Sequence, residues 1–475
     1  MKISAIYKNA SMTQKITCWI FAIVSLVFFY SYTYGDIVST ARMGITLWDN
    51  VFSGTIREFY RDRVYMTITA YAQDMWATYD FPIYIIFAIW NFPLWLLEHF
   101  AGVDVLNNAL CMMWTKTMLL PFIYFLIQAL YRVCTALKME EEKARLTCVL
   151  FLTSALFTSS VIVISQYDII EMCFVLLGIA AYIQGDMKKF VLWFAVSIPL
   201  KYFALLLFVP LLLLREKRIL WILWDTLKAI GILILFRILI PFYGGYEDLN
   251  GNRVKRYPFE YTAHLGVDRV YLFILAFGML LCVCYFIKLS SEQEYISYTL
   301  YTGFIVYFIQ YSTMYTHPYW VIMFVPYICL IIVNNDRYFL VNLCLEMLMS
   351  LGLVFAQIFK FYWCFDSAIA SGMFWPLILG KADSATPLSI VSFLSVMTDG
   401  NSDKIVEHAI GIGSTVFVGC GILFALLNCP VFKNEINVVQ GDKTAVKWLL
   451  RIRILADMAI ASVPLAFYIV NLIMA

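Results

Sequence analysis

The sequence has little charge, and this shortage is its most informative property. Only 14% of its 475 residues are Asp, Glu, Lys or Arg, whereas 62% are hydrophobic. A soluble globular domain carries about 25% charged residues. Apolar runs recur from Ile16 onward, and each is long enough to cross a hydrocarbon core of about 30 Å. This pattern excludes a water-soluble fold and predicts an integral membrane protein with many crossings.

The chain also lacks a large excess of charge of either sign. Its formal net charge is +2, from 34 basic and 32 acidic residues. A nucleic-acid-binding surface needs a concentrated basic patch, but Lys and Arg here lie in short segments between apolar runs. Segments of that kind set the orientation of a membrane protein. We therefore expect a membrane partner and no nucleic acid.

Cysteine and histidine never occur in a ligand-like pattern. The 12 cysteines are scattered through apolar stretches, none forms a CxxC pair, and there are only 4 histidines. A zinc site or a disulfide framework needs closely spaced residues of these types. Buried structural thiols are expected instead, and neither a metal nor another cofactor is indicated.

The sequence further lacks features that would divide it into parts. The first apolar run follows three lysines but has no small-residue cleavage site, so we expect a retained first span rather than a removed signal peptide. No internal repeat of fixed period and no low-complexity linker is visible. One membrane domain over residues 1–475 is predicted.

What the sequence does contain predicts an all-α fold, a polytopic transmembrane bundle of about 11–13 membrane helices. The distribution of Lys and Arg places the N-terminus in the cytoplasm and the protein in the cell membrane, because more than half of the 34 basic residues then lie in inside segments. The expected spans are 15–34, 112–137, 146–166, 169–185, 189–214 (a broken pair), 219–241, 269–289, 295–315, 318–334, 339–361, 408–428 and 449–474. Besides the N-terminus, the inside segments contain Arg132 to Arg145, Lys188 and Lys189, Arg215 to Arg218, Lys288, Arg337, and Lys433 to Arg453.

Residues 81–100 are apolar enough to span, but a crossing here would invert every later loop. Pro82, Pro93 and the central Asn91 favour two short half-helices that dip into the outer leaflet and return. Irregular backbone at that depth is tolerated only where protein or a water-filled cavity covers it. We prefer this re-entrant interpretation, with an extra span as the alternative.

On this topology three polar segments lie outside the membrane, at 35–80, 242–268 and 362–407. The first interleaves aromatic and charged residues at helical spacing. This spacing predicts two or three short helices lying along the membrane surface. The last of the three, 362–407, is predicted to form another large outer loop.

Asp36 comes directly after the first span, where the helix meets the outer surface. A carboxylate there can be partly desolvated and still reach a water-soluble substrate, so it is a candidate general base. An aspartate that merely marks the end of a helix is the alternative. Asp49, Glu58, Asp62 and Asp80 in the same loop are further candidates, which their spacing alone cannot rank.

Two basic groups lie on the outer side. Arg57, Arg61 and Arg63 fall in the first outer loop, and Arg253, Lys255 and Arg256 belong to the second. The guanidinium fork offers two parallel hydrogen bonds to a phosphate. A solvated loop explains either group alone, but the positive-inside rule depletes this side of such residues. The two groups together therefore favour phosphate binding.

Three further polar residues stand at outer ends of apolar runs. Asp168 ends the motif SQYD, His317 opens the outer turn THPYW, and Lys201 lies between two short runs that contain Pro199 and Pro210. A cation at a break in a membrane helix is costly unless it has a partner or a ligand. The alternatives are a lysine that snorkels to the surface and a histidine that faces water.

The order of these motifs resembles the GT-C superfamily of membrane glycosyltransferases. Asp36 follows the first span and opens a long outer loop that ends in the aromatic-proline segment YDFPIY. The segment from SQYD to the leucine-rich run after Lys201 is similar to one in bacterial polyprenyl-phosphate-sugar transferases. THPYWVIMFVPYICLII is similar to their histidine-containing outer turn and the helix after it. The resemblance covers most of residues 15–335.

The sequence departs from the family pattern at two places. Ile37 follows Asp36, where several branches have a second acidic residue, and Asp80-Phe81-Pro82 replaces a double proline. The resemblance therefore names neither the sugar nor the acceptor.

The resemblance implies an inverting transferase that moves a sugar from a polyprenyl-phosphate carrier to a glycan, lipid or protein acceptor on the outer face. It implies Asp36 as the base and Asp168 as a supporting or acceptor-orienting carboxylate. No metal or other cofactor is required by this scheme. The residues implied for the lipid phosphate are Arg57, Arg61, Lys201, Arg256 and His317.

Two other function classes stay open at this point. A lipid-linked-sugar flippase or another transporter would favour internal repeats and charges along a central cavity. A polysaccharide polymerase or ligase would also use a large outer loop, but arginines and a histidine should then decide its chemistry rather than Asp36.

Overall fold

The computed structural model describes residues 12–62, 64–68, 71–241, 256–264, 266, 268–371, 373–380, 389–398, 402–432 and 443–474. Within these ranges nearly all regular structure is helical, and the strands form two short antiparallel hairpins. The predicted all-α polytopic fold is therefore confirmed.

By length and composition, six described helical segments could cross a membrane, and the number rises to eight if each of two bent helix pairs is one span. Four shorter apolar helices accompany them. The chain is thus a multi-pass membrane protein. The six long segments are Phe81–Ala101, Ala109–Ala136, Ile219–Leu239, Asp336–Lys360, Ser402–Asn428 and Thr444–Met474.

The N-terminal part differs from the predicted set of short surface helices. The first helix breaks after residue 31, and the next one leaves it at an angle of 72°. A 3₁₀ helix and a hairpin follow, with Val64 paired to Met75 and Ile68 to Tyr71. One long helix, one short 3₁₀ helix and a hairpin thus occupy the segment for which we predicted two or three short helices. The elements are α2 (Met12–Ser31), α3 (Gly35–Ser53), η1 (Ile56–Arg61), β1 (Val64–Ile68) and β2 (Tyr71–Met75).

The helix α4 (Phe81–Ala101) shows that the predicted pair of half-helices is wrong. It is one continuous helix with Pro93 inside it. The buried Asn91 does not mark a break, because its side chain accepts a hydrogen bond of 2.9 Å from Thr115 on the following helix. Gly102 ends α4 with a φ of 63°, a conformation that glycine adopts readily. Whether α4 crosses the membrane or re-enters stays a prediction.

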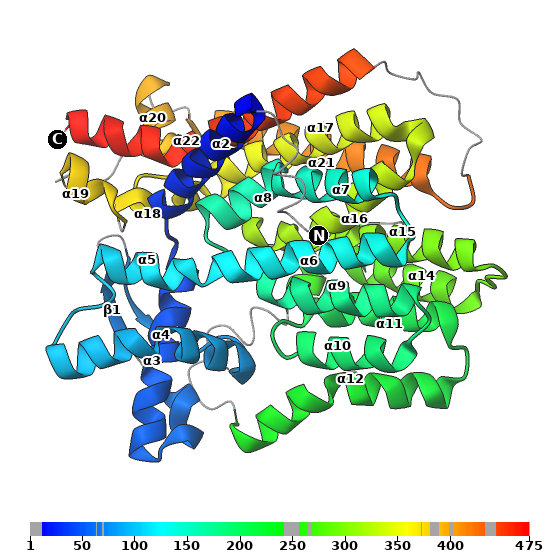
Figure 1. Ribbon diagram of the computed structural model, residues 1–475, viewed down its shortest axis with the longest axis horizontal. Coiled ribbons are helices and arrows are strands. Elements are labelled where there is room, and N and C mark those ends of the chain that lie inside the picture. The colour runs from blue at the N-terminus through cyan, green and yellow to red at the C-terminus, as the bar shows by residue number, and fades with distance from the viewer. Residues whose placement is uncertain are drawn as a thin grey trace.

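The middle of the chain forms a layer of helices that lie side by side. In Figure 1, α9 packs against α6 on one side and α10 on the other, and α12 covers α10. A Cβ atom at Gly178 of α9 would lie 2.7 Å from the ring of Phe194 of α10, so this close approach requires glycine. The elements are α5 (Ala109–Thr117), α6 (Leu119–Ala136), α7 (Glu141–Leu152), α8 (Ala155–Phe157), η2 (Thr158–Val163, a π-helical stretch), α9 (Ile169–Ile183), α10 (Met187–Ser197), α11 (Phe203–Arg215) and α12 (Ile219–Leu239).

The C-terminal half adds a second group of packed helices. A Cβ atom at Gly413 would lie 2.5 Å from the carbonyl oxygen of Gly352, so these two glycines bring α17 and α21 into close contact. The last helix returns to the first, because the Tyr32 hydroxyl donates a hydrogen bond to the carbonyl of Ala461. The elements are η4 (Tyr257–Phe259), β3 (Thr262–His264), β4 (Arg269–Tyr271), α14 (Leu272–Phe286), α15 (Glu292–Thr313), η5 (Pro318–Phe324), α16 (Val325–Asn334), η6 (Asp336–Tyr338), α17 (Phe339–Lys360), η7 (Tyr362–Cys364), α18 (Ala368–Ser371), α19 (Trp375–Leu379), α20 (Ile390–Met397), α21 (Ser402–Asn428) and α22 (Lys443–Met474).

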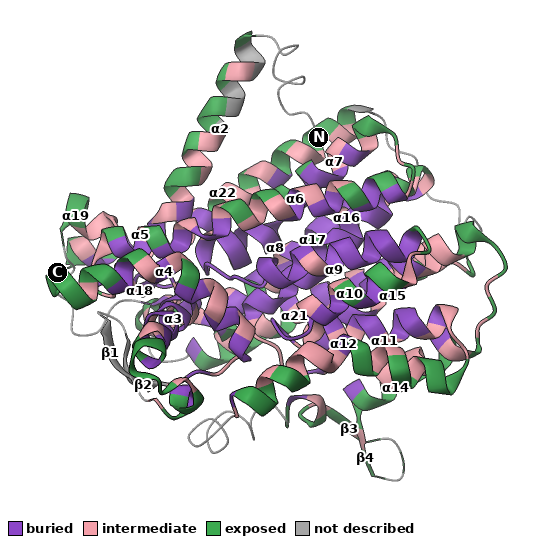
Figure 2. Cartoon of the chain, turned by 60° about the horizontal axis from the view of Figure 1, so that its bottom comes forward, coloured by how far each residue is buried: buried purple, intermediate pink, exposed green. Residues whose placement is uncertain are grey.

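Burial follows the pattern expected of a bundle in lipid. Figure 2 shows buried residues concentrated in the middle of the bundle, whereas exposed residues are frequent on α2 and at the bundle margin. The peripheral helix α12 exposes large apolar side chains, among them Leu220 (81%) and Ile238 (71%). In water these side chains would form a large apolar patch, so their natural surroundings are acyl chains.

The loops predicted to lie inside gather at one end of the bundle. Lys143 forms an ion pair of 2.6 Å with Asp336, and Lys138 lies 3.6 Å from Glu292. The opposite ends of the helices carry the predicted site residues, since Asp168 precedes α9 and Lys201 precedes α11. The bundle thus has a basic end and a separate end where the candidate site lies.

Candidate functional site

The break between α2 and α3 sets the position of Asp36. The carbonyl oxygen of Tyr32 accepts a hydrogen bond of 2.6 Å from the ammonium group of Lys116, and the N–H group of Thr33 donates to Ile369 at 2.9 Å. The backbone of the break is therefore fixed from α5 and α18. Asp36 lies in the first turn of α3, where the helix dipole stabilises a negative charge.

Side chains from three other segments meet the carboxylate of Asp36. The Tyr79 hydroxyl lies 3.5 Å from Oδ2, and the Tyr319 hydroxyl also hydrogen-bonds this group. The ammonium group of Lys201 is close enough to attract the same carboxylate. Asp36 is therefore part of a polar cluster rather than a plain helix boundary.

Lys201 and Asp168 form a buried ion pair. Their side chains are 7% and 1% exposed, and Nζ of Lys201 donates to Oδ2 of Asp168. The same Nζ lies 5.0 Å from the ring centroid of Trp320 and 5.2 Å from that of Phe203. Lys201 does not snorkel to the surface, because its partner lies inside the protein. The pair brings the start of α9 next to the break between α10 and α11.

A second ion pair, which the sequence did not reveal, joins Asp80 to Arg237. Nε of Arg237 lies 2.9 Å from Oδ1 of Asp80, and its Nη2 lies 3.0 Å from the Tyr202 hydroxyl. The Asp80 side chain is 3% exposed, whereas that of Arg237 is 45% exposed. Burial raises the pKa of Asp80, and the Arg237 guanidinium opposes this rise. The pair ties the start of α4 to the last turn of α12.

A cavity of about 260 Å³ opens beside these charges. Tyr79 and Lys201, which both act on Asp36, form part of its wall, and Asp80 forms another part. Most of the remaining wall is aromatic or aliphatic. Such a cavity suits a ligand with a large apolar body and a small charged or polar end. The other lining residues are Thr78, Leu200, Tyr202, Phe203, Leu205, Leu206, Tyr257, Pro258, Phe273, Met314 and Trp320.

His317 lies behind one wall of this cavity. Its ring is 4.8 Å from that of Trp320 and stacks at 5.3 Å on that of Tyr319. His317 is half-buried among these rings rather than fully open to water. It can orient Trp320 and Tyr319, which in turn face Lys201 and Asp36.

The predicted arginines lie outside the polar cluster. Arg57 and Arg61 are exposed on η1, and Arg61 pairs with Glu58 at 3.1 Å. This helix nevertheless neighbours the cavity, because the Tyr60 hydroxyl donates to the carbonyl of Tyr79 at 2.9 Å. Neither arginine lines the cavity.

Arg256 is also exposed, although it directly precedes the cavity-lining Tyr257. The two predicted basic groups also contained Arg63, Arg253 and Lys255. These three lie outside the described residues. The structure thus brings together Asp36, Asp168 and Lys201, and it leaves Arg57, Arg61 and Arg256 exposed outside this cluster.

The other acids of the first outer segment have local partners. Oδ1 of Asp49 accepts a hydrogen bond of 2.7 Å from the indole of Trp95, and Asp62 accepts one of 2.5 Å from Asn50. Neither carboxylate is among the groups that act on Asp36, whereas Asp36 itself interacts with Tyr79 and Lys201 of the cavity wall. Asp36 is therefore the better candidate for chemistry within this segment.

In the part of the chain that the structure describes, no group of three or more His, Cys, Asp or Glu residues could hold a metal ion. The polar cluster around Asp36 instead offers carboxylates, hydroxyl groups and an ammonium group.

Comparison with known proteins gives no independent identification. The chain matches no protein family model, no curated protein and no solved structure. The chemistry of the site therefore has to follow from its own residues.

Proposed function

We propose that this protein is a GT-C-type glycosyltransferase, a hexosyltransferase that moves a sugar from a polyprenyl-phosphate carrier to an acceptor hydroxyl. One observation carries the proposal. A half-buried carboxylate at the start of α3, Asp36, and a buried ammonium group, Lys201, meet beside an aromatic cavity within a membrane bundle. This reaction needs a base for the acceptor hydroxyl, a cation for the phosphate and an apolar cavity for the lipid chain.

Asp36 serves as the general base in this scheme. It accepts the proton of the acceptor hydroxyl while the acceptor oxygen forms a bond to the anomeric carbon. The bond between that carbon and the phosphate oxygen of the donor breaks from the opposite side, so the configuration inverts. The hydroxyl groups of Tyr79 and Tyr319 orient the carboxylate through the hydrogen bonds described above.

Lys201 stabilises the departing polyprenyl phosphate. Charge builds up on the phosphate as the bond breaks, and a preorganised cation in a site with little water stabilises that charge strongly. Asp168 holds the ammonium group in place from the start of α9. The exposed Arg57, Arg61 and Arg256 would meet the phosphate earlier, as the donor approaches.

The remaining cavity accommodates the first units of the polyprenyl chain. Phe203, Leu206 and Phe273 line it, and Lys201 lies at its polar side. A lipid donor can therefore place its phosphate beside Lys201 while its hydrocarbon stays among apolar side chains.

The proposal includes an orientation in the cell membrane, with the N-terminus in the cytoplasm and the reaction on the outer face. Its support is the position of the basic loops at the end of the bundle opposite to Asp36 and Lys201. The acceptor, a glycan, a lipid or a protein, then reaches Asp36 from the outside.

The decisive experiment is the substitution Asp36→Asn in the purified, detergent-solubilised protein. Transfer is measured with a panel of polyprenyl-phosphate monosaccharides, and binding of the active donor is measured separately. Asn keeps the shape and hydrogen bonding of the side chain but cannot accept the proton. We expect turnover to fall about 10²–10⁴-fold with donor binding retained.

Asp49→Asn is the matched control, because Asp49 lies on the same helix and hydrogen-bonds Trp95 away from the cavity. Its turnover should remain near that of the wild type. Transfer by Asp36→Asn at the wild-type rate would remove Asp36 as the base, and Asp168 would be tested next.

A further inference from the structure

A second cavity lies between helices from the two ends of the chain. It has a volume of about 330 Å³, and α2 and α22 form much of its wall, with residues of α6, α7, α8 and η2 completing it. It shares no lining residue with the cavity beside Lys201. Its lining is apolar except for Ser25, Thr158 and Asp457.

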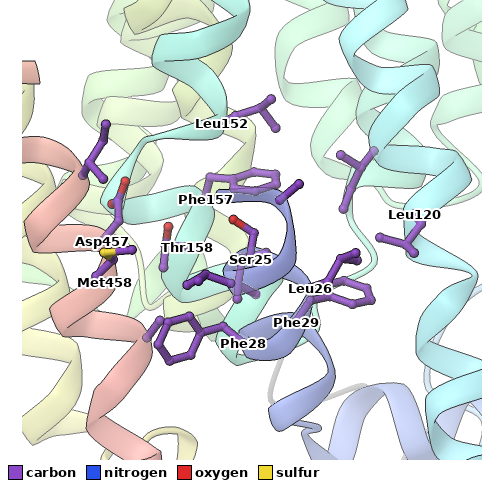
Figure 3. A pocket seen from close by; sticks show the side chains of 16 residues that line it. Ser25, Leu26, Phe28, Phe29, Leu120, Leu152, Phe157, Thr158, Asp457 and Met458 are labelled. Atoms are coloured by element: carbon purple, nitrogen blue, oxygen red, sulfur yellow. The ribbon is translucent and has the colours of Figure 1, made fainter. Parts of the chain in front are cut away.

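The carboxyl group of Asp457 has an unused hydrogen-bonding position. The Thr158 side chain hydrogen-bonds this group. Its Oδ1 atom is shielded from solvent and has no hydrogen-bond partner among the described residues. Figure 3 shows Asp457 and Thr158 from one wall turned toward the space that Ser25 faces from α2. An acidic side chain at this depth in a membrane protein normally marks a ligand or an ion path.

The nearest cation does not form an ion pair with Asp457. Arg453, one turn earlier on α22, binds both carboxylate oxygens of Glu346 and donates to the carbonyl of Leu150 at 2.7 Å. Arg453 attracts Asp457, but Arg453 and Glu346 already compensate each other. Asp457 is thus left without a cation of its own, and a ligand with one positive charge would supply it.

The cavity is accessible from the hydrocarbon region of the bilayer. Leu26, which lines it, is 43% exposed, and Ile23 one turn earlier on α2 is 56% exposed. Leu455 is 65% exposed on α22. Since these side chains face lipid, a ligand that is itself dissolved in the bilayer can enter between α2 and α22.

From this geometry we infer that the cavity binds a long-chain primary amine. The alkyl chain lies against Phe28, Phe29 and the other apolar residues of the wall. The ammonium group donates a hydrogen bond to Oδ1 of Asp457 and balances its charge. The site is independent of the proposed transferase activity, because it uses none of the residues around Asp36.

The test compares three ligands of equal chain length, dodecylamine, dodecan-1-ol and dodecanoic acid. Native mass spectrometry of the purified full-length protein counts the bound molecules across a titration. We expect saturable binding of one dodecylamine, about tenfold or more tighter than that of the alcohol, since a charge-assisted bond replaces a neutral one. The fatty acid should bind weakest, because its charge has the same sign as that of Asp457.

Three variants locate the site. Asp457→Asn should remove the preference for the amine. Ser25→Phe should weaken the binding of all three ligands, because the larger side chain fills the cavity. Asp225→Asn is the control, since Asp225 pairs with Lys228 at 2.8 Å on α12, outside this cavity. The inference is overturned if the wild type binds alcohol and amine equally well, or if Asp457→Asn keeps the preference. Unchanged binding in Ser25→Phe also overturns it, and neither this result nor the wild-type comparison depends on Asp457→Asn folding.

Discussion

The ammonium group of Lys116 lies 2.6 Å from the carbonyl oxygen of Tyr32 and 2.9 Å from that of Ile162. The first carbonyl lies in the break between α2 and α3, and the second lies in η2, just ahead of the break before α9. Asp36 follows the first break, and Asp168 lies at the end of the second. One buried lysine thus fixes the backbone that carries both predicted carboxylates, although it touches neither of them.

Replacement of Lys116 by Met should destabilise the protein and misplace Asp36. The carbonyl oxygen of Ile162 would lose its donor, and that of Tyr32 would keep only the Ser165 hydroxyl at 3.3 Å. An unsatisfied buried group costs about 1–3 kcal/mol. We expect a lower unfolding temperature in detergent together with a reduced turnover at saturating donor. Lys143→Met is the control, because Lys143 forms an exposed ion pair with Asp336 and should change little. An unchanged unfolding temperature in Lys116→Met would contradict this role.

The substitution Lys201→Gln should weaken the binding of a polyprenyl phosphate. A charge-assisted hydrogen bond contributes about 1.5–3 kcal/mol, so the Kd should rise about tenfold or more. Loss of Lys201 alone also leaves Asp168 unpaired in the interior, which typically costs about 3–5 kcal/mol. The double variant Lys201→Gln/Asp168→Asn should therefore recover stability but not donor affinity.

The double variant Arg57→Ala/Arg61→Ala tests the two exposed arginines of η1. Both side chains are exposed, so the fold should survive and the loss of donor affinity should be smaller than in Lys201→Gln. A larger loss in this variant than in Lys201→Gln would move the phosphate site from the cavity to η1.

Asp366 should make stability depend on pH. It lies between η7 and α18, is 8% exposed, and burial raises its pKa to about 6. The folded state therefore binds this proton more tightly than the unfolded state, whose carboxyl has a pKa of about 3.9. The resulting stability is complete below pH 4 and is lost as the pH rises through 6.

The variant Asp366→Asn keeps the acceptor for the N–H group of Ala368 but cannot ionise. Its free energy of unfolding should exceed that of the wild type by up to about 3 kcal/mol at pH 8 and by little or nothing near pH 4. Thermal unfolding at the two pH values measures this difference. Equal gains at both values would show that ionisation of Asp366 does not matter for stability.

The topology can be tested with single cysteines at Glu140 and Asn250. On the predicted topology, an impermeant maleimide labels position 250 in intact cells and labels position 140 only after permeabilisation. The parent protein without the added cysteine serves as the control, because it has cysteines of its own. The reverse pattern would mean that α4 crosses the membrane.

The sequence predicted the membrane bundle well because helix-length apolar runs are a local signal. It failed where a polar or proline residue had two explanations. Asn91 and Pro93 were interpreted as a break, yet Asn91 bonds Thr115 of α5, and the helix continues past Pro93. The hairpin of β1 and β2 was missed because its charged and aromatic residues also fit helical spacing.

The candidate site, too, was predicted only in part. Asp36 and Lys201 stand out in the sequence because a charge beside or within an apolar run is rare. The partners of such residues cannot be read from spacing, since Asp80 and Arg237 meet only after α4 and α12 have packed. Lys116 also lies within an apolar run, but its partners could not be read from the sequence, because they are backbone carbonyls, which every residue has.

The hydrogen bond from Tyr32 to Ala461 has a consequence for biosynthesis. The first helix enters the bilayer early in translation, but its partner in α22 leaves the ribosome only when synthesis is almost complete. Until then the break ahead of Asp36 lacks one of its supports. A nascent chain that has already inserted most of its helices therefore still lacks this hydrogen bond, and only the arrival of the final helix completes the support of the backbone ahead of Asp36.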